Sequence, residues 1–226
     1  MVFSSTLFLF LFLPLVLAGS LVFRRFGRNA FLAAASLVFY VWGEPTWAPI
    51  FFCSILGNFV LGLWLASTER KSTVLALGVA SNLGLLAFFK YGDFAWANAA
   101  SLLEALRVKV PPRAATHLPI GISFFTFHAI SYLVDVRRAK VLPQRNPIDF
   151  ALYVSLFPQL VAGPIVRYHE IEAQLSRRDT TLSGFAGGAR RFVLGLGKKV
   201  LIANTLAVPA DAIFQIPPHE LTASVA

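Results

Sequence analysis

The sequence predicts an all-α fold: a polytopic bundle of transmembrane helices with additional re-entrant and interfacial helices. Hydrophobic residues make up 57% of the 226 residues and charged residues only 14%, against about 25% charged residues in soluble domains. Phe alone occurs 22 times, so a soluble fold of this length could not bury the apolar surface. Long apolar runs recur along the chain, and about 20 helical residues cover the ~30 Å hydrocarbon core of a bilayer.

Five apolar runs are candidate spans: residues 6–23, 29–42, 47–66, 73–89 and 117–134. No Lys or Arg precedes the first run, and Arg24, Arg25 and Arg28 follow it. This order indicates a stop-transfer segment and not a cleavable signal peptide. The second run is short, so it could be tilted within a bundle or only partly inserted. We therefore expect a multi-pass protein whose N-terminus lies outside.

The distribution of basic residues supports this topology. The net charge is +9, from 20 basic and 11 acidic residues, and basic loops follow the first, third and fifth candidate spans. Basic loops are retained in the cytoplasm, where an external N-terminus would place these three loops. Residues 90–116 would then lie outside and include an interfacial helix over 93–106. No basic-aromatic pattern of a nucleic-acid-binding module is visible, so we expect no nucleic-acid partner.

Residues 148–164 form an apolar run that Pro158 interrupts and Gly163-Pro164 ends. Strongly basic sequence follows, and it would lie outside if this run crossed the bilayer. Irregular backbone at membrane depth is tolerated only inside protein or beside a wet cavity. We therefore predict a re-entrant segment that enters and leaves on the cytoplasmic side and lines a cavity. Residues 185–203 predict a basic amphipathic helix, either on the anionic membrane surface or with a charged face within the bundle.

Two clusters of polar residues lie where such groups are costly. A spacing of i, i+4, i+7 places His128, Tyr132 and Asp135 on one helix face. The second cluster lies in FPQLVAGPIVRYHEI, Phe157 to Ile171, and contains Gln159, Gly163, Pro164, Arg167 and His169. Because Arg binds phosphate or carboxylate through a planar fork and His titrates near neutrality, this cluster could hold an anionic or acyl-bearing ligand. The alternatives are a hydrogen-bonded structural His128 and a structural turn in which Arg167 pairs with Glu170.

The sequence predicts no metal site and no bound cofactor. Its four histidines are far apart, and Cys53 is the single cysteine. HExxH, Walker and GxSxG motifs are absent. We interpret Cys53 as a small core hydrophobe.

Five blocks of sequence occur in order along the chain: MVFSSTLFLFLFLPL, RNAFLAAASLVFYVWGEP, LPIGISFFTFHAISYLVDV, FPQLVAGPIVRYHEI and RRFVLGLGKKVLIANTLA. They resemble successive blocks of the membrane-bound O-acyltransferase (MBOAT) family, in the branch of the bacterial alginate O-acetyltransferase membrane subunit. The resemblance implies an inner-membrane enzyme that moves an acetyl group from a cytoplasmic donor, such as acetyl-CoA or another acyl donor, toward an exported alginate-like polysaccharide. It also implies periplasmic acetylation or polysaccharide export proteins as partners, besides membrane lipid and the polysaccharide acceptor.

Members of this family form a ring of helices around a funnel. The resemblance places His128, Tyr132 and the five residues of the second cluster at the lining of the funnel or of the donor entrance. A histidine in the second half of the family's proteins is thought to assist transfer as a general base. Because those proteins are roughly twice as long, we expect that histidine beyond Ala226. The chain is then a truncated or incomplete N-terminal part of one membrane domain, residues 1–226, without activity of its own. The alternatives are a non-catalytic scaffold of a polysaccharide export or modification complex and a small-solute transporter.

Overall fold

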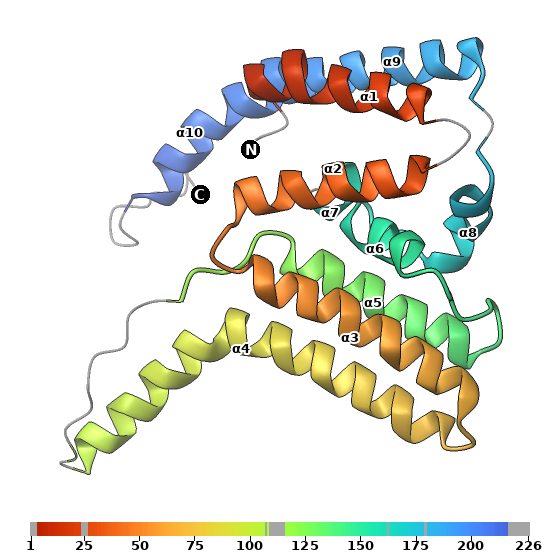
Figure 1. Cartoon of the computed structure of the whole chain (residues 1–226). Helices are drawn as coiled ribbons and strands as arrows, with labels where there is room; N and C mark the ends of the chain where they lie inside the picture. Colours follow the sequence, from red (N-terminus) through yellow and green to blue (C-terminus); the bar gives the residue numbers. More distant parts are fainter. Residues whose placement is uncertain are drawn as a thin grey trace. The chain divides into compact units, whose positions relative to one another are not determined.

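The computed structural model of the chain describes residues 4–23, 27–106, 108, 116–161, 163–178 and 180–216, and the regular structure in these ranges is entirely helical (Figure 1). The all-α prediction is therefore confirmed. The chain divides into two compact units. The larger unit begins at Leu13 and ends at Arg177, and the smaller one combines residues up to Phe12 with residues from Arg178 onward.

The larger unit contains α1 (Leu13–Val22), α2 (Arg28–Gly43), α3 (Ala48–Ser67), α4 (Lys71–Ala105), α5 (Ile122–Arg137), α6 (Pro147–Ser155), α7 (Phe157–Leu160) and α8 (Tyr168–Ser176). Helix α3 packs against α4, α5 and α6, and α2 packs against α6 and α7. Aromatic rings fill the junction between α2, α3 and α5. The ring centroids of Tyr40 and Phe51 are 4.1 Å apart, and those of Phe51 and Phe125 are 5.0 Å apart.

Three described helical runs are long and apolar enough to cross a membrane: Ala48–Ser67, Lys71–Ala105 and Leu182–Phe214. A shorter apolar helix, Phe8–Val22, lies in the first candidate span. Helix α3 has 20 residues and therefore a length of about 30 Å. Pro49 stands in its first turn, where the missing N–H has no intrahelical partner to lose. These features fit a membrane helical bundle.

Helix α4 corrects the prediction for residues 73–106. We expected a span over 73–89 and a separate interfacial helix over 93–106, whereas the structure has one helix of 35 residues. The intervening Lys90-Tyr91-Gly92-Asp93 carries charge but no proline, and a single glycine costs a helix only about 1 kcal/mol. Alanine-rich sequence then favours continuation. The helix extends over about 52 Å, more than a ~30 Å hydrocarbon core, and Figure 1 shows that it changes direction between its yellow and lime parts.

Helix α5 begins five residues later than the candidate span 117–134. The backbone before it is held by Gly121, whose φ of +74° lies in the left-handed region that favours glycine. A Cβ at Gly121 would lie 2.8 Å from the backbone oxygen of Leu160. The start of α5 therefore touches the backbone of α7, and only glycine fits there.

The predicted re-entrant segment 148–164 forms two short helices. Leu156 separates α6 from α7 with φ −50° and ψ 111°, and Pro158 stands in the first turn of α7. Their nine and four residues extend about 14 Å and 6 Å. Neither helix could cross a ~30 Å core alone. The side from which the segment enters stays a prediction.

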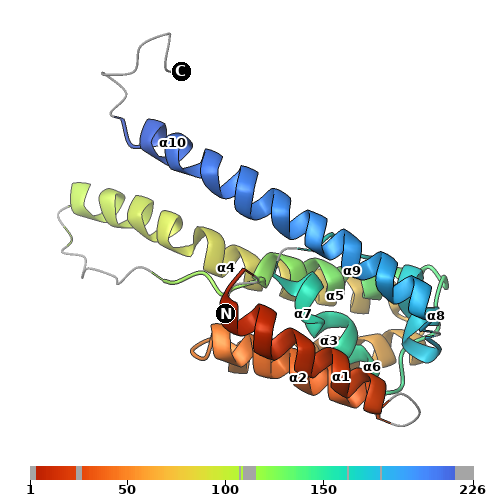
Figure 2. The same cartoon turned by 90° about the horizontal axis from the view of Figure 1, so that it is seen from above.

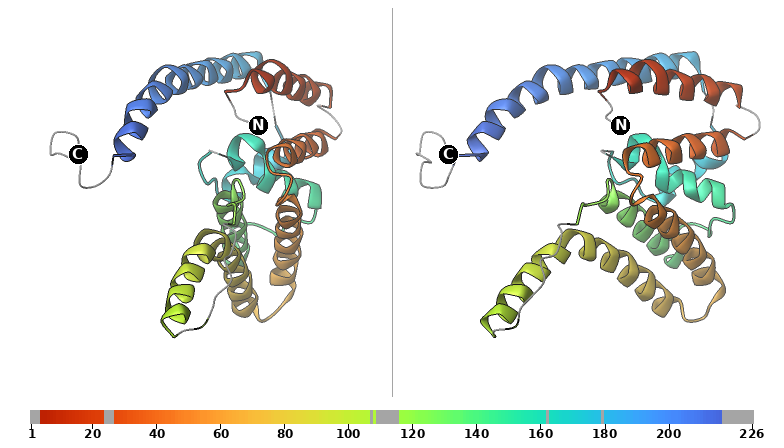
Figure 3. Two further views of the ribbon diagram at one scale, coloured as in Figure 1. Left: turned by 90° about the vertical axis from the view of Figure 1, so that its left-hand side faces the viewer. Right: turned by 60° about the vertical axis from the view of Figure 1, so that its left-hand side comes forward.

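In the smaller unit, the residues 185–203 predicted as a basic amphipathic helix are helical and form part of a longer helical run. Helix α9 (Leu182–Gly197), the π-helical turn η2 (Lys198–Ala203) and α10 (Asn204–Phe214) follow one another without interruption, as both views in Figure 3 show. Pro209 lies inside α10 without ending it. A second π-helical turn, η1 (Phe8–Phe12), belongs to the same unit, where Lys199 Nζ donates to Ser4 Oγ at 3.0 Å.

Several predicted features lie outside the described residues. These are the basic residues Arg24 and Arg25 of the first loop, most of the loop 107–115 and the sequence after residue 216. The placement of the loops relative to the membrane stays a prediction.

Candidate functional site

The two predicted polar clusters meet where α5 packs against α8, the short helix that Figure 2 labels next to the start of α9. Asp135 lies in the last turn of α5 and is 4% exposed. His169 lies in the first turn of α8. The Nδ1 atom of His169 is 2.8 Å from Asp135 Oδ2, and the backbone N–H of His169 donates to the same oxygen at 3.5 Å. An imidazole held through Nδ1 keeps Nε2 available for a second partner.

A second contact joins His128 of α5 to Gln159 of α7. His128 is fully buried, and its Nε2 lies 2.7 Å from the side-chain nitrogen of Gln159. If the amide is oriented as described, its N–H donates to Nε2, and the opposite nitrogen of the ring carries the proton. That Nδ1 atom is buried without a hydrogen-bond partner among the described residues. His128 is therefore packed in the core beside the break between α6 and α7, and its Nδ1 atom has no hydrogen-bond partner among the described residues.

Tyr153 links the broken helix to α5. Its hydroxyl lies 3.1 Å from the carbonyl oxygen of His128 and 3.2 Å from that of Val166. The ring is fully buried, and its centroid is 5.5 Å from that of the His128 imidazole. Carbonyl groups freed by irregular backbone need a donor when they are buried. Tyr153 supplies one next to the His128–Gln159 contact, a role that no sequence pattern indicated.

Tyr132 and Tyr168 complete an aromatic cluster with Tyr153. The ring centroid of Tyr168 is 5.0 Å from each of the other two. Gln144 ties the cluster together, because its backbone N–H donates to the Tyr132 hydroxyl at 3.1 Å and its side chain donates to the Tyr168 hydroxyl at 3.0 Å. Burial raises the pKa of the Tyr168 phenol to about 12, so this hydroxyl stays neutral at physiological pH. Gly62 of α3 makes room, because a Cβ there would lie 2.4 Å from the Tyr132 hydroxyl oxygen.

Gly163 and Pro164 lie in the non-helical stretch between α7 and α8. A Cβ at Gly163 would lie 2.6 Å from the Cα of Gln159 and 3.0 Å from its carbonyl oxygen. The backbone at Gly163 therefore approaches Gln159, the residue that contacts His128, too closely for a larger residue to fit without a shift. Pro164 is exposed and makes the turn without taking part in either polar contact.

Arg167 is exposed at the N-cap of α8. The expected pairing with Glu170 occurs through the backbone, since the N–H of Arg167 donates to the Glu170 carboxylate at 3.3 Å. The Arg167 side chain lines a pocket of about 400 Å³ together with Asp135, Arg138 and Lys140. Arg167 and Asp135 thus border one pocket. His128 and Gln159 do not line it.

A buried carboxylate at the opposite end of α5 was also missed. Glu44, which follows α2, is 4% exposed, and its Oε2 is 3.0 Å from His117 Nε2 and 3.4 Å from the backbone nitrogen of Ile120. The His117 side chain is 69% exposed. A carboxylate in the short turn 43–46 between two apolar runs is a sequence signal for such a pairing.

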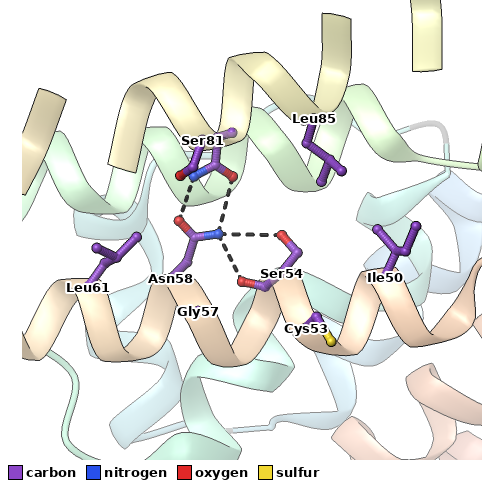
Figure 4. Close-up of a pocket in the computed structure, with 9 residues that line it drawn as sticks. Ile50, Cys53, Ser54, Gly57, Asn58, Leu61, Ser81 and Leu85 are labelled. Carbon is purple, nitrogen blue, oxygen red and sulfur yellow. Dashed lines mark hydrogen bonds between the residues drawn. The ribbon is translucent and has the colours of Figure 1, made fainter. Parts of the chain in front are cut away.

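A polar pair between α3 and α4 was missed as well. Asn58 and Asn82 exchange two side-chain hydrogen bonds, of 3.1 Å and 2.7 Å, and both residues are at least 96% buried. Each also donates to a backbone oxygen of its own helix. The pair borders a second pocket, which Figure 4 shows between the two helices. Cys53 lines this pocket and is exposed, not buried as its apolar surroundings suggested.

Among the described residues, no group of three or more His, Cys, Asp or Glu side chains is placed to hold a metal ion. The described site offers hydrogen bonding, an oriented imidazole and cationic side chains at the adjoining pocket.

The sequence is similar to those of known membrane acyltransferases. The sequence profile of the membrane-bound O-acyltransferase family matches residues 5–225. The chain is 40% identical over 222 residues to the probable alginate O-acetylase AlgI of Pseudomonas putida, and 40% identical to that of Pseudomonas aeruginosa. It is 32% identical over 250 residues to the peptidoglycan O-acetyltransferase of Helicobacter pylori.

These alignments cover 93% to 96% of this chain but only 42% to 46% of the three relatives. The chain therefore spans less than half the length of these curated relatives. No solved structure matches the chain.

Proposed function

The chain belongs to the membrane-bound O-acyltransferase family, and we propose that it acts in O-acetyl transfer to an exported polysaccharide, as the part of the enzyme that receives the acyl donor. The observation that carries this proposal is the 40% identity to alginate O-acetylases over nearly the whole chain. A relative that acetylates peptidoglycan supports a carbohydrate acceptor, and alginate is the acceptor we favour. The membrane would be the bacterial inner membrane, with the N-terminus outside and periplasmic acetylation or export proteins as partners.

Acyl transfer needs an activated acyl donor, a base near the acceptor hydroxyl and dipoles that stabilise the oxyanion. The lining that we propose would serve the first of these needs, the binding of the acyl donor. We assign the lining of the donor entrance to His128, Tyr132, Gln159, Gly163, Pro164, Arg167 and His169. The donor would be acetyl-CoA or another acyl donor from the cytoplasm. The chemical centre itself would use a residue that is not among these.

The Asp135–His169 contact supports this assignment, because it orients the imidazole of His169. A carboxylate bound to Nδ1 fixes the tautomer and the orientation of an imidazole, so that Nε2 can accept or donate a proton or a hydrogen bond in a fixed direction. The His128–Gln159 contact fixes a second imidazole, on α5 and about two turns before Asp135. This second contact lies beside the broken helix α6–α7, where backbone groups are free of helical pairing.

A chimera tests the proposed function. This chain would replace the matching N-terminal segment of the Pseudomonas aeruginosa relative in a strain that lacks that gene. We expect the exported alginate to carry O-acetyl groups, measured by NMR of the purified polymer. A chimera that accumulates in the membrane but leaves alginate unacetylated would contradict the proposal and favour a scaffold.

Side-chain variants of the same chimera test the assigned residues. His169→Ala and Gln159→Ala should lower acetylation at least tenfold without lowering the amount of protein in the membrane. Arg145→Ala is the matched control, because Arg145 is exposed and lines neither pocket. Unchanged acetylation in the two variants would remove these residues from the donor entrance.

A further inference from the structure

The pocket at the C-terminal end of α5 carries an excess of positive charge. Arg138 is the C-cap of α5, Lys140 follows two residues later, and Arg167 is the N-cap of α8, so three separate positions supply the cations of the pocket. No Asp or Glu side chain pairs with any of these three within the part of the chain that the structure describes. The carboxylate that lines the pocket, Asp135, already contacts His169 at 2.8 Å. The three cations are therefore available to an anion.

The backbone fixes the position of these cations. The N–H of Ala139 donates to the carbonyl of Val136 at 3.1 Å, and that of Lys140 donates to the carbonyl of Asp135 at 3.0 Å. This is the hydrogen-bond pattern of a Schellman motif, which needs a left-handed residue after the helix. Ala139 fills that position with φ +55°, although alanine rarely adopts it. The turn therefore holds Arg138 and Lys140 at one end of α5.

The rest of the pocket runs along α5 and is apolar apart from Ser131. Phe127, Ile130 and Val134 follow one another toward Arg138 at helical spacing. They cover about 10 Å of α5, and Phe127 lies about 16 Å along the helix from Arg138. Phe127 is 40% exposed, and Ile165 on the opposite wall is 48% exposed. The pocket thus joins a cationic end to an apolar wall that could accommodate part of a lipid acyl chain.

We propose that this pocket binds an anionic membrane phospholipid. The phosphate would lie between Arg138, Lys140 and Arg167, and an acyl chain would cover the Phe127–Ile130–Val134 wall. Basic pockets between membrane helices recognise anionic headgroups in this way, and Arg matches the geometry of phosphate oxygens. The phosphates of acetyl-CoA could occupy the cationic end, but its pantetheine arm carries two amides that would lie on the apolar side chains of Phe127, Ile130 and Val134, where an unpaired amide is costly to bury. The lipid is therefore the occupant that the charge and the apolar length favour together.

Native mass spectrometry of the purified full chain in detergent tests this proposal. Phosphatidylglycerol would be titrated into the protein, with phosphatidylcholine as the zwitterionic probe. We expect phosphatidylglycerol to bind at least tenfold more tightly. The triple variant Arg138→Ala/Lys140→Ala/Arg167→Ala should lose about a hundredfold in phosphatidylglycerol affinity, because each basic residue near an anionic headgroup contributes roughly fivefold.

A matched triple variant separates a site from general surface charge. Arg70→Ala/Lys71→Ala/Arg145→Ala removes the same number of exposed cations from outside the pocket, and it should keep the parent affinity. Equal losses in the two triple variants would overturn the proposal. Circular dichroism of each variant shows whether the helices are intact.

Two further measurements distinguish the binding of a lipid from the binding of a soluble phosphate compound. Phe127→Ala/Ile130→Ala should weaken phosphatidylglycerol binding severalfold, because the acyl chain loses its wall. If this variant binds phosphatidylglycerol as the parent does, or if acetyl-CoA displaces the lipid at equal concentration, the pocket is a site for soluble phosphates and the proposal fails. Because the readout is lipid binding, the outcome does not depend on polysaccharide acetylation.

Discussion

The Asn58–Asn82 pair allows the packing of α3 on α4 to be tested quantitatively. Replacing Asn58 by Ala removes both bonds between the two amides, of 2.7 Å and 3.1 Å, and Asn82 then keeps only its bond of 2.8 Å to the carbonyl of Gly78. The Asn82 amide would be left 97% buried with an unpaired oxygen. An unsatisfied buried polar group costs about 1–3 kcal/mol, whereas hydrogen bonds between membrane helices average about 0.6 kcal/mol each. We therefore expect each single Ala variant to lose about 1–2 kcal/mol of stability.

A double-mutant cycle isolates the interaction. The double variant Asn58→Ala/Asn82→Ala leaves no unpaired partner, so its loss should be smaller than the combined losses of the single variants by about 1 kcal/mol. The assay is reversible unfolding of the purified protein from mild detergent into sodium dodecyl sulfate, followed by circular dichroism. Asn98→Ala serves as the control, because Asn98 is exposed and bonds only within its own helix, and it should cost less than about 0.5 kcal/mol. Additive losses in the cycle would refute the reasoning.

Three backbone and packing variants can be measured in the same assay. Ala139→Gly should stabilise the protein by about 1 kcal/mol, because glycine adopts the left-handed φ of +55° without strain, and a loss of stability would show that the turn is not strained. Gly121→Ala should lower the free energy of unfolding by more than about 2 kcal/mol, because the added Cβ would lie 2.8 Å from the backbone oxygen of Leu160. Gly84→Ala is its control and should cause no loss, because no atom lies within 4 Å of the added Cβ. Gly62→Ala should cost about 1–3 kcal/mol by displacing the buried ring of Tyr132, and intact stability there would mean that the ring has room to move.

Local sequence patterns predicted a helix correctly where neighbouring residues determine its two ends. Helix α3 was expected over 47–66 and is found at Ala48–Ser67, because an apolar run with a proline in its first turn defines both its length and its start. Helix α4 was divided wrongly, because the charges of Lys90 and Asp93 resemble a helix end in hydropathy but do not interrupt helical hydrogen bonding.

The contacts that form the site depend on packing that no local pattern encodes. Asp135 and His169 are 34 residues apart, and their 2.8 Å contact requires the particular register of α5 on α8. The His128–Gln159 contact likewise requires the break at Leu156, which turns α7 toward α5. By contrast, the Asn58–Asn82 pair could have been predicted. Two asparagines in neighbouring apolar spans each need a partner at membrane depth, and each is the nearest polar amide available to the other.

Asp135 provides a test that distinguishes the two proposed roles of this region. Its carboxylate holds His169 and also places one negative charge in the cationic pocket. Asp135→Asn keeps the size of the side chain and one acceptor oxygen for the imidazole but removes the charge. Phosphatidylglycerol should then bind about fivefold more tightly, because one repulsive charge near an anionic headgroup is worth about 1 kcal/mol. Acetylation by the chimera should fall instead, because the imidazole of His169 is held less firmly.

The control is Glu69→Gln, which removes an exposed charge from outside the pocket and should change neither lipid binding nor acetylation. A simultaneous fall of lipid binding and acetylation would show that Asp135 only holds α8 in place, and unchanged lipid binding would show that the pocket does not sense charge.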